Sequence, residues 1–494
     1  MPSPHPTYLQ TVLKPNFEHS VRHFFEPLMD INLAHAIMLT RCGIVKKTHG
    51  ARILGALEQI RREGKTLQSY RYRGDEEDLF FYVEKRLGKI CGPEISGHLS
   101  VARSRNDVDI TLYRMVLRQE LIQTARQSVG LRQLLLELAG QHVKTIFPVI
   151  THTQLAQPTT LAHYLLAAVE FLDRDFARIT NAYSFVNQCP LGACVATTTG
   201  FPIDRALLAS ILGFESVLEN AYGCIAGVDY LIESVSTVST LMINLGRFIQ
   251  DLLLWSSQNS RLIHLADGFV QGSSIMPQKR NPVALEHLRV LASSAVGQCQ
   301  AVILSLHNTP FGDIVDAEDD VQPAVRSAFE YTSRVLDLLT QVLKSVTIDV
   351  DRALSICQSG EITLTELADW LVRNHQLPFR TAHRIVSEVA GHLSRQPARR
   401  RGESMAQAVS LLTEETSRRL LGRTIRVSPE QMVNILDPIH FVQVRRVIGG
   451  PAPRVVERSI ASHTKKVERQ KEWLVRKEEA LKSYAKKLHL DNFK

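Results

Sequence analysis

The stretch that decides the fold is AGVDYLIESVSTVSTLMINLGRFIQDLLLWS, residues 226–256. Its apolar side chains recur at steps of three and four, which is the periodicity of one helix face and not of a strand. A single helix over this stretch would be about 46 Å long at 1.5 Å per residue. Such long helices with a broad apolar stripe are typical of bundles, which are often oligomeric. The apolar positions are Val228, Leu231, Val235, Val238, Leu241 or Met242, Leu245, Phe248 or Ile249, and Leu252.

Three other segments show the same periodicity, at 107–143, 160–187 and 282–306. Alternating strand patterns are scarce, and the sequence contains neither a G-x-G-x-x-G after a strand nor a Walker loop, so nucleotide-binding folds are disfavoured. We therefore predict an all-α protein with three mostly helical domains and a tail. The predicted ranges are an N-terminal helical domain at 1–107, a central long-helix bundle at 108–358, a small C-terminal helical domain at 359–454 and a basic helical tail at 455–494.

The composition of the chain excludes several classes of protein. Its 494 residues are 44% hydrophobic and 22% charged, as expected of a globular protein. The sequence contains no run of about 18 apolar residues, which a membrane-spanning helix would need, and its start does not resemble a secretory signal. We therefore expect a cytoplasmic location. The seven cysteines are scattered without C-x-x-C spacing, which favours reduced thiols over disulfides or a zinc site.

The net charge of +8 could suggest a nucleic-acid partner. Much of the excess, however, lies in ARRR (398–401) and in HTKKVERQKEWLVRKEEALKSYAKK (463–487). Glutamates recur in the second segment at helical spacing, so a solvated helix is favoured over a nucleic-acid-binding arm, and the chain has no base-reading motif. A positive balance also suits an enzyme that acts on small polyanions.

Three polar stretches each precede a predicted helix. In GSSIMPQKRNP (272–282), Asn281 and Pro282 have the pattern of an N-cap followed by the first helical residue. Helix N-termini favour anions. Each stretch alone could be ordinary capping, but three with hydroxyls, amides or cations predict a site for a small dianion. The other two stretches contain Ser104, Arg105 and Asn106, and Thr151, His152 and Gln154.

These residue types suit the carboxylates of a succinyl unit. Arginine binds a carboxylate through two hydrogen bonds and lysine provides a point charge. A loop serine beside cations and N–H groups can act as a base once its alkoxide is stabilised. No G-x-S-x-G surrounds the serines, which weakens an esterase interpretation. Proton abstraction beside a carboxylate gives a doubly charged aci-carboxylate, so elimination across a succinyl unit is the predicted chemistry.

The motifs resemble those of one enzyme family. GSSIMPQKRNP is similar to the signature loop of the fumarase/aspartase superfamily. ARSRND, THTQLAQP, PLGACVATTTGFPIDR and LPFRTAHRIV resemble the argininosuccinate lyase branch, and the matches extend from about residue 30 to about residue 450. The resemblance implies a homotetramer with a long helix bundle and active sites shared by three chains. It also implies reversible cleavage of an N-substituted aspartate into fumarate and an amine, without cofactor, metal, nucleic acid or membrane.

The resemblance also implies roles for individual residues. Ser273 would be the base that removes the Cβ proton. His152 would lie near the leaving nitrogen, as a candidate acid or an orienting group, although it could also be a structural histidine. The succinyl carboxylates would be held by Lys279, Asn281, Ser104, Arg105, Asn106 and Thr151, with Gln154 in the same substrate-binding set.

Two departures from the family pattern bear on the substrate. Phe80 stands at or beside the place of a family histidine that contacts argininosuccinate. In NTPFGDIVDAEDDVQP (308–323), Ala317 and Asp320 stand where the family has Gln and Lys, and this stretch has no lysine. An acidic residue there would attract an ammonium and repel the distal carboxylate of argininosuccinate.

These departures favour an N-substituted aspartate other than argininosuccinate. A related activity of this kind is that of ethylenediamine-N,N'-disuccinate (EDDS) lyase. Argininosuccinate lyase is the alternative. A non-catalytic, crystallin-like structural protein and a nucleic-acid-binding helical protein are the candidates from other classes, and the retained Ser273, Lys279, Asn281 and His152 argue against the first of these.

Overall fold

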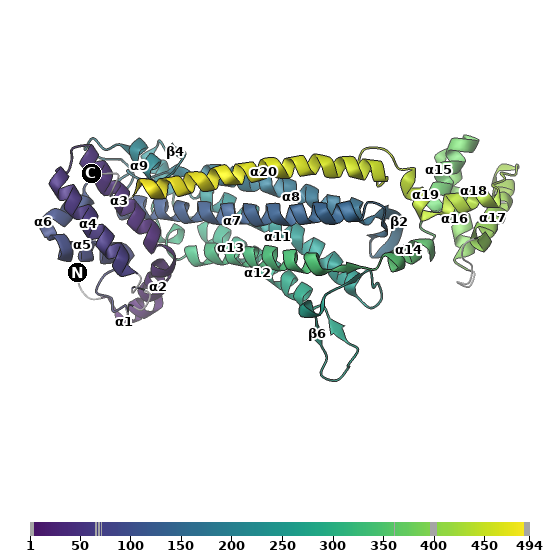
Figure 1. The fold of residues 1–494 in the computed structure, drawn as a ribbon, viewed down its shortest axis with the longest axis horizontal. Coiled ribbons are helices and arrows are strands. Elements are labelled where there is room, and N and C mark those ends of the chain that lie inside the picture. The colour runs from purple at the N-terminus through teal and green to yellow at the C-terminus, as the bar shows by residue number, and fades with distance from the viewer. Residues whose placement is uncertain are drawn as a thin grey trace.

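The computed structural model describes residues 4–64, 67, 70, 72–359, 361–395 and 403–488. Helices make up 71% of it and strands 5%, so the all-α prediction is confirmed. The segment that decides the fold forms α11 (Asp229–Ser256), and the other three periodic segments form α7 (Arg105–Gln141), α8 (Leu161–Val186) and α12 (Val283–Leu306). These helices lie along the long axis of an elongated molecule (Figure 1).

The central bundle contains one more long helix, α13 (Gln322–Ser345). Helix α11 packs against α8 and α12, while α13 packs against α7 and α12. The apolar stripe of α11 is the reason: Leu231, Val235, Leu241 and Leu245 are all at most 1% exposed. Burial of a side chain of this size contributes about 1.5–3 kcal/mol, so the stripe fixes the position of α11 in the bundle.

Shorter helices form the two ends of the molecule. The N-terminal helices share one hydrophobic core with the bundle, whereas α15 to α18 enclose a separate core. The domain boundaries stay a prediction. The N-terminal elements are α1 (Pro6–Tyr8), η1 (Leu9–Leu13), α2 (Lys14–His23), α3 (Phe25–Arg41), α4 (Lys47–Glu63), α5 (Leu79–Cys91), α6 (Pro93–Ser96) and η3 (Gly97–Ser100). The C-terminal helices are α14 (Val350–Ser359), α15 (Leu364–His375), α16 (Phe379–Leu393), α17 (Glu403–Leu421), α18 (Pro429–Leu436) and α19 (Pro438–Gln443).

Short strand pairs, which the sequence analysis did not predict, lie in the connections of the bundle. An antiparallel hairpin joins β1 (Ile146–Thr151) to β2 (Gln154–Thr160), and a second joins β6 (Gln271–Gly272) to β7 (Arg280–Asn281). A further pair, β3 (Gln188–Cys189) with β4 (Ser216–Val217), lies beside the short helix α9 (Arg205–Ile211), which α10 (Ala221–Ala226) follows along the chain. The last pair, β5 (Ile263–His264) with β8 (Thr347–Ile348), lies beyond the end of α11. The two hairpins carry polar residues that the sequence analysis singled out.

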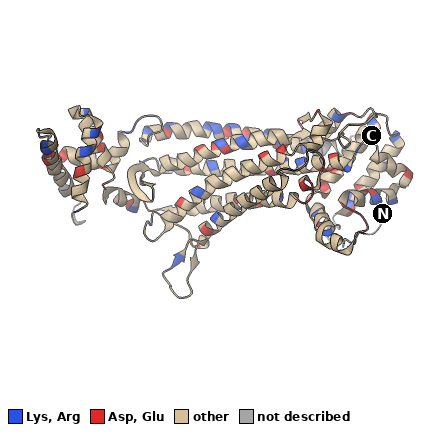
Figure 2. Ribbon diagram, turned by 180° about the vertical axis from the view of Figure 1, so that it is seen from behind, with Lys and Arg blue, Asp and Glu red and all other residues tan. Residues whose placement is uncertain are grey.

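The basic tail forms α20 (Pro453–Lys487), which runs along α7 and α8 of its own chain (Figure 1). Val467 and Leu474 are buried on its inner face. Beside them Arg132 pairs with Asp173 at 2.8 Å and donates to Gln470 Oε1 at 2.7 Å. Lysines, arginines and glutamates alternate on its outer face (Figure 2), so the described part of the tail is a helix with one packed face and one charged face. The basic run at 398–401 lies outside the described residues.

The C-terminal part of α20 packs against α7 and lies beside the short helix α9. Tyr484 is 6% exposed, and its ring lies 5.1 Å from the guanidinium carbon of Arg118. Arg118 is fully buried and donates to the carbonyl oxygens of Leu212 and Gly213 at 2.7 and 3.1 Å. Gly213 has a φ of +71°, and a Cβ there would lie 2.7 Å from Tyr484 Cδ1. This close approach requires a glycine.

Helix α12 has an apolar face that its own chain does not cover. Val290 and Leu304 are 58% and 71% exposed, and Ile243 on the neighbouring α11 is 51% exposed. By length and composition, Val283–Leu306 is the one helix among the described residues that could cross a membrane. Only 28% of its apolar window is buried within the chain. Large apolar patches on a protein surface mark interfaces.

Candidate active site

The predicted site residues lie in three separate regions of the chain. Ser104, Arg105 and Asn106 are at the start of α7, whereas Thr151, His152 and Gln154 are in the β1–β2 hairpin that follows its other end. Helix α7 has 37 residues. It therefore separates the two groups by about 55 Å. Ser273, Lys279 and Asn281 belong to the β6–β7 hairpin, which also lies away from the start of α7 (Figure 1). A single chain does not bring the three stretches together.

The signature stretch 272–282 forms the β6–β7 hairpin. Gln271 pairs with Asn281, and Gly272 pairs with Arg280. In the connecting loop, Ser273 Oγ accepts hydrogen bonds from the backbone N–H groups of Ile275 at 3.2 Å and Met276 at 3.1 Å. Two N–H donors at one oxygen stabilise negative charge there, as in an oxyanion hole. The geometry therefore suits a serine that works as an alkoxide base.

The predicted helix start at Asn281 and Pro282 is wrong by one residue. Asn281 has the extended backbone of β7 because it pairs with Gln271, and Pro282 itself takes the N-cap position of α12. The Asn281 side chain is half-buried and Lys279 is exposed. Both residues remain near a helix N-terminus, where they can meet an anion.

The β1–β2 hairpin carries His152 at its turn. His152 and Thr153 have φ values of +51° and +64°, as a two-residue turn of type I′ requires. Thr151, paired with Gln154, precedes this turn, and all four side chains are exposed. Within the described part of the chain, the His152 ring makes no hydrogen bond. Its surroundings therefore do not support the interpretation as a structurally satisfied histidine.

At the start of α7, the predicted binding residues contact acidic side chains of their own chain. Arg105 pairs with Glu77 at 2.9 Å and with Asp78 at 3.1 Å. Asn106 Nδ2 donates to Asp313 Oδ2. Ser104 Oγ donates to Asn106 Oδ1 at 2.6 Å, so Ser104, Asn106 and Asp313 form one hydrogen-bonded group.

Behind Arg105 lies a small acidic cavity of about 100 Å³, lined by Asp78, Asp109, Glu318 and Asp319 among others. Burial, followed by the charge of Asp319, raises the pKa of Asp109 well above its ordinary value. Burial, followed by the carboxylate of Asp313, raises the pKa of Glu318 to about 7. Several carboxyl groups with one arginine favour a cation beside them.

Phe80 and Asp320, the two departures from the family pattern, both lie near this end. Phe80 lines a neighbouring cavity of about 450 Å³ together with Ser104, Arg105 and Asn106. The guanidinium carbon of Arg103 is 5.0 Å from its ring centroid. Asp320, in contrast, is exposed and accepts a hydrogen bond from Asn16 Nδ2 at 3.0 Å. The carboxylates that line the acidic cavity on this loop are those of Glu318 and Asp319.

The sequence analysis missed Asp109 and Glu318. A signal was present for Asp109, because it follows Arg105 by four residues and so shares its helix face. Glu318 lies between Ala317 and Asp320 in the stretch 308–323, but no role was predicted for it. Its side chain enters the cavity because η5 (Val315–Ala317) turns the loop just before it, and sequence alone gives no sign of that turn.

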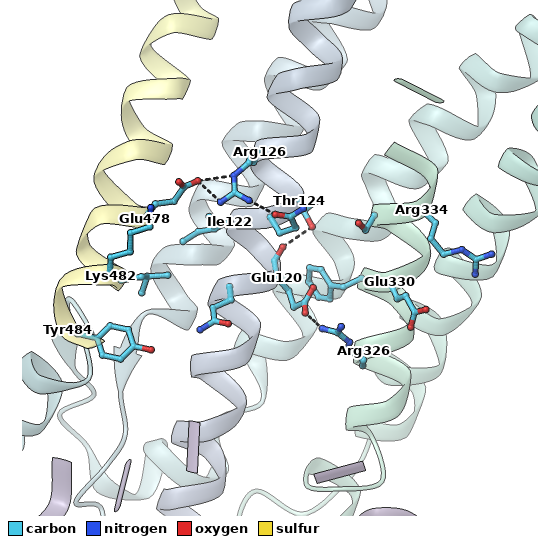
Figure 3. A pocket seen from close by; sticks show the side chains of 15 residues that line it. Glu120, Ile122, Thr124, Arg126, Arg326, Glu330, Arg334, Glu478, Lys482 and Tyr484 are labelled. Atoms are coloured by element: carbon cyan, nitrogen blue, oxygen red, sulfur yellow. Dashed lines mark hydrogen bonds and ion pairs between the residues drawn. The ribbon is translucent and has the colours of Figure 1, made fainter. Parts of the chain in front are cut away.

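A larger groove of about 680 Å³ lies elsewhere, between α7, α13 and α20 (Figure 3). Two ion pairs lie along it: Arg126 with Glu478, and Arg326 with Glu120. None of the predicted site residues lines this groove. We therefore assign the candidate active site to the three polar stretches.

Solved structures identify the class of protein to which this fold belongs. An EDDS lyase variant with bound fumarate matches with a TM-score of 0.86 at 28% identity, over 98% of this chain and 95% of that one. A class II fumarase from Schistosoma mansoni matches with a TM-score of 0.67 at 16% identity, over 85% and 90%. The fold is therefore that of the fumarase/aspartase superfamily.

Sequence comparisons identify the branch. Residues 26–297 match the family model of the lyases, and residues 361–443 match that of the argininosuccinate lyase C-terminal region. Argininosuccinate lyase 2 of Agrobacterium fabrum is 40% identical over 94% of this chain and 91% of its own length. Argininosuccinate lyase 1 of Shouchella clausii is 32% identical over 98% of both. The chain belongs to the argininosuccinate lyase branch of the fumarase/aspartase superfamily and is a carbon–nitrogen lyase that releases fumarate.

Proposed function

We propose that this lyase releases fumarate reversibly from an N-substituted aspartate whose amine portion carries a further positive charge. EDDS, a diamine with two succinyl groups, is the compound that we favour. The observation that supports this proposal is the acidic cavity beside Arg105, where Glu318 and Asp319 belong to a loop without any lysine.

In the proposed reaction, the alkoxide of Ser273 removes the Cβ proton of the aspartyl unit. The electron pair moves into the adjacent carboxylate, which becomes a doubly charged aci-carboxylate. The Cα–N bond then breaks, the double bond of fumarate forms, and the amine leaves with its electron pair and gains a proton. His152 is the candidate donor of that proton, since its ring is exposed at the tip of a hairpin.

Positive and polar side chains would hold the succinyl carboxylates in this reaction. Lys279 and Asn281 belong to the same hairpin as Ser273, and each donor aimed at the developing charge is worth about 3 kcal/mol in comparable sites. Thr151 and Gln154 would contribute from the β1–β2 hairpin, and Ser104, Arg105 and Asn106 from the start of α7.

The acidic cavity would bind the amine portion. An ammonium placed beside Asp109 and Glu318 would favour their ionised forms and would be attracted in return. The distal carboxylate of argininosuccinate would be repelled by the same groups, and the second succinyl group of EDDS would need a partner outside this cavity. Asp320 would add to the negative potential from the rim of the cavity, because its side chain is exposed.

The site would be completed in a homotetramer, with three chains contributing one polar stretch each. The separation of the stretches along α7 supports this arrangement, because one chain alone leaves each of them incomplete. The uncovered apolar face of α12, with Val290 and Leu304, supports it independently. The cytoplasmic location stays a prediction.

The test is fumarate release, followed by its ultraviolet absorption, with EDDS and argininosuccinate offered in parallel to the purified protein. Fumarate with a panel of amines would be offered in the reverse direction. Release from EDDS and not from argininosuccinate is the expected result. Rapid release from argininosuccinate would instead support the second candidate, argininosuccinate lyase, which is the name of the similar proteins from Agrobacterium fabrum and Shouchella clausii. Release of fumarate from neither compound, and no addition to any amine, would contradict the proposal.

A further inference from the structure

The carboxylate of Asp107 joins two segments that are far apart in the sequence. Its side chain is fully buried in the first turn of α7. Oδ1 accepts the backbone N–H of Ser104 at 2.8 Å. Oδ2 accepts two more backbone N–H groups, from Gly192 at 2.8 Å and from Cys194 at 3.2 Å. One side chain thus connects the predicted substrate-binding stretch to the loop at 190–200.

Both joined segments have strained backbones. In the loop, Cys194, Val195 and Thr198 have φ values of +49°, +72° and +60°. On the other side Ala102 has a φ of +56°, and its carbonyl oxygen accepts a hydrogen bond from Cys194 Sγ at 2.9 Å. Residues with side chains adopt such angles rarely, and they persist only where surrounding contacts impose them. Strained segments of this kind concentrate at functional sites.

The contacts of Asp107 are not those of an ordinary ion pair or cap. Arg103 uses its guanidinium for Asn32 Oδ1 at 2.6 Å and Glu84 Oε1 at 3.2 Å, and Arg105 pairs with Glu77 and Asp78. Among the described residues, the carboxylate accepts hydrogen bonds only from backbone N–H groups. Capping of α7 accounts for the bond from Ser104. The bonds from Gly192 and Cys194 serve no helix end and instead fix the loop.

We propose that Asp107 is a positioning residue: it holds the strained loop at 190–200 against the start of α7 and thereby fixes Ser104 and Asn106 for dicarboxylate binding. The inference rests on the proposed function, since it assigns the start of α7 to the succinyl group. Asp107 does not itself touch the substrate, because it is fully buried behind Ser104. It acts through the backbone of the residues that do.

The test compares Asp107→Asn with Asp175→Asn. Asp175 is a suitable control because it is equally buried, lies in α8 and accepts hydrogen bonds from Arg178 at 2.8 Å and Asn244 at 3.2 Å. In Asp107→Asn the amide nitrogen must face at least one backbone N–H, so the two segments separate. Binding of succinate and fumarate would be measured by calorimetry, and backbone amides would be followed by hydrogen exchange.

The expected result is that Asp107→Asn weakens dicarboxylate binding at least tenfold and speeds exchange at Ser104, Gly192 and Cys194. In turnover, KM should rise more than kcat falls. Asp175→Asn should lower the melting temperature to a similar extent without either effect. Equal effects of the two variants on binding, or unchanged exchange at Gly192 and Cys194, would overturn the inference.

A milder variant, Cys194→Ala, keeps the N–H donor and removes only the bond from Sγ to Ala102. It should fold like the wild type and weaken succinate binding a few-fold, so it decides the question if Asp107→Asn does not fold; unchanged binding would then overturn the inference. If the wild-type protein binds no dicarboxylate, the proposed function fails. The exchange rates at Gly192 and Cys194 would still show whether Asp107 holds the two segments.

Discussion

The β6–β7 hairpin and the start of α7 carry the same kinds of polar residue in opposite settings. On the hairpin, Ser273 has two backbone N–H donors, and Lys279 extends from an exposed loop. At the start of α7, Arg105 and Asn106 are already bonded to carboxylates of their own chain. The hairpin is open to a ligand, whereas the start of α7 is built into a network.

We infer from this difference that one part of the site has been kept and that another has changed. The hairpin retains the signature of the superfamily, and its chemistry depends on a local turn that any family member can form. The network at α7 includes Phe80, Asp109 and Glu318, which adjoin the positions where the chain departs from the family pattern. We infer that the residues proposed to hold the succinyl group, those at the start of α7 included, are shared with the relatives, and that the acidic cavity behind them distinguishes this enzyme.

The largest expected effect comes from the hairpin. Replacement of Ser273 by Ala removes the proposed base, so kcat for fumarate release should fall by about 10²–10⁴-fold. The melting temperature should hardly change, because the hairpin packs against little. The control is Ser274→Ala, which alters an exposed neighbour and should retain turnover. Near wild-type turnover of Ser273→Ala would remove the hairpin from the chemistry.

Mixed tetramers test whether the hairpin and the start of α7 serve one site from different chains. Ser273→Ala and Asn106→Ala should each be nearly inactive. Random tetramers formed from both should regain about a quarter of wild-type activity, because each site draws the two residues from different chains. Light scattering would establish the tetramer, and turnover after mixing would be compared with each variant alone. No recovery from confirmed mixed tetramers would place both residues in one chain's site.

A smaller effect is expected at the acidic cavity. Because the pKa of Glu318 is raised to about 7, its carboxyl group ionises as the pH rises through that value. Affinity for a cationic amine in the reverse reaction should therefore increase over the same range. Glu318→Gln should abolish this increase. At a pH above the pKa of Glu318, the variant should have a KM for the amine about tenfold higher than the wild type, equivalent to about 1.4 kcal/mol.

Two comparisons sharpen this result. The ratio of the wild-type and variant pH profiles removes the titration of the amine itself. A carboxyl group with a raised pKa binds its proton more tightly in the folded state, so the wild type should lose stability relative to Glu318→Gln as the pH rises from about 4.5 to about 7. Parallel pH profiles of KM would exclude Glu318 from amine binding.

The smallest effect on activity is expected away from both regions. Gly213→Ala places a methyl group against Tyr484 and forces a positive φ on alanine, so the free energy of unfolding should fall by about 1–3 kcal/mol. Fumarate release should stay near the wild-type rate. The matched control is Gly130→Ala on the exposed side of α7, which meets no atom within 4 Å and should stabilise the protein by about 0.5–1 kcal/mol. Denaturant unfolding would measure both changes.

Much of the fold could be predicted because the spacing of apolar residues in a long helix is visible in the sequence. Four segments with steps of three and four became α7, α8, α11 and α12. The β1–β2 hairpin could not, because its turn uses His152 and Thr153 at positive φ instead of the usual Asn-Gly pair. Its strands also include Pro148 and Pro158, which normally argue against a strand.

The candidate site could be predicted as a set of residues but not as an arrangement. The motifs identified Ser273, Lys279 and Arg105 from residue type and resemblance. Their separation follows from the length of α7 and the order of the helices, which a local pattern does not reveal. Asp107 was missed because a short acidic side chain in a first turn is usually a cap, and its bonds to Gly192 and Cys194 depend on tertiary contacts.

Helix α20 has a consequence for how the chain is assembled during synthesis. Tyr484 packs on Gly213 and Arg118, and the C-terminal part of α20 lies at the same end of the molecule as the N-terminal helices (Figure 1). Arg118 is therefore enclosed only after residue 484 has left the ribosome, although its own helix leaves the ribosome much earlier. A nascent chain in which α20 is not yet made would expose the apolar and cationic groups that α20 covers, which is the kind of surface that chaperones bind.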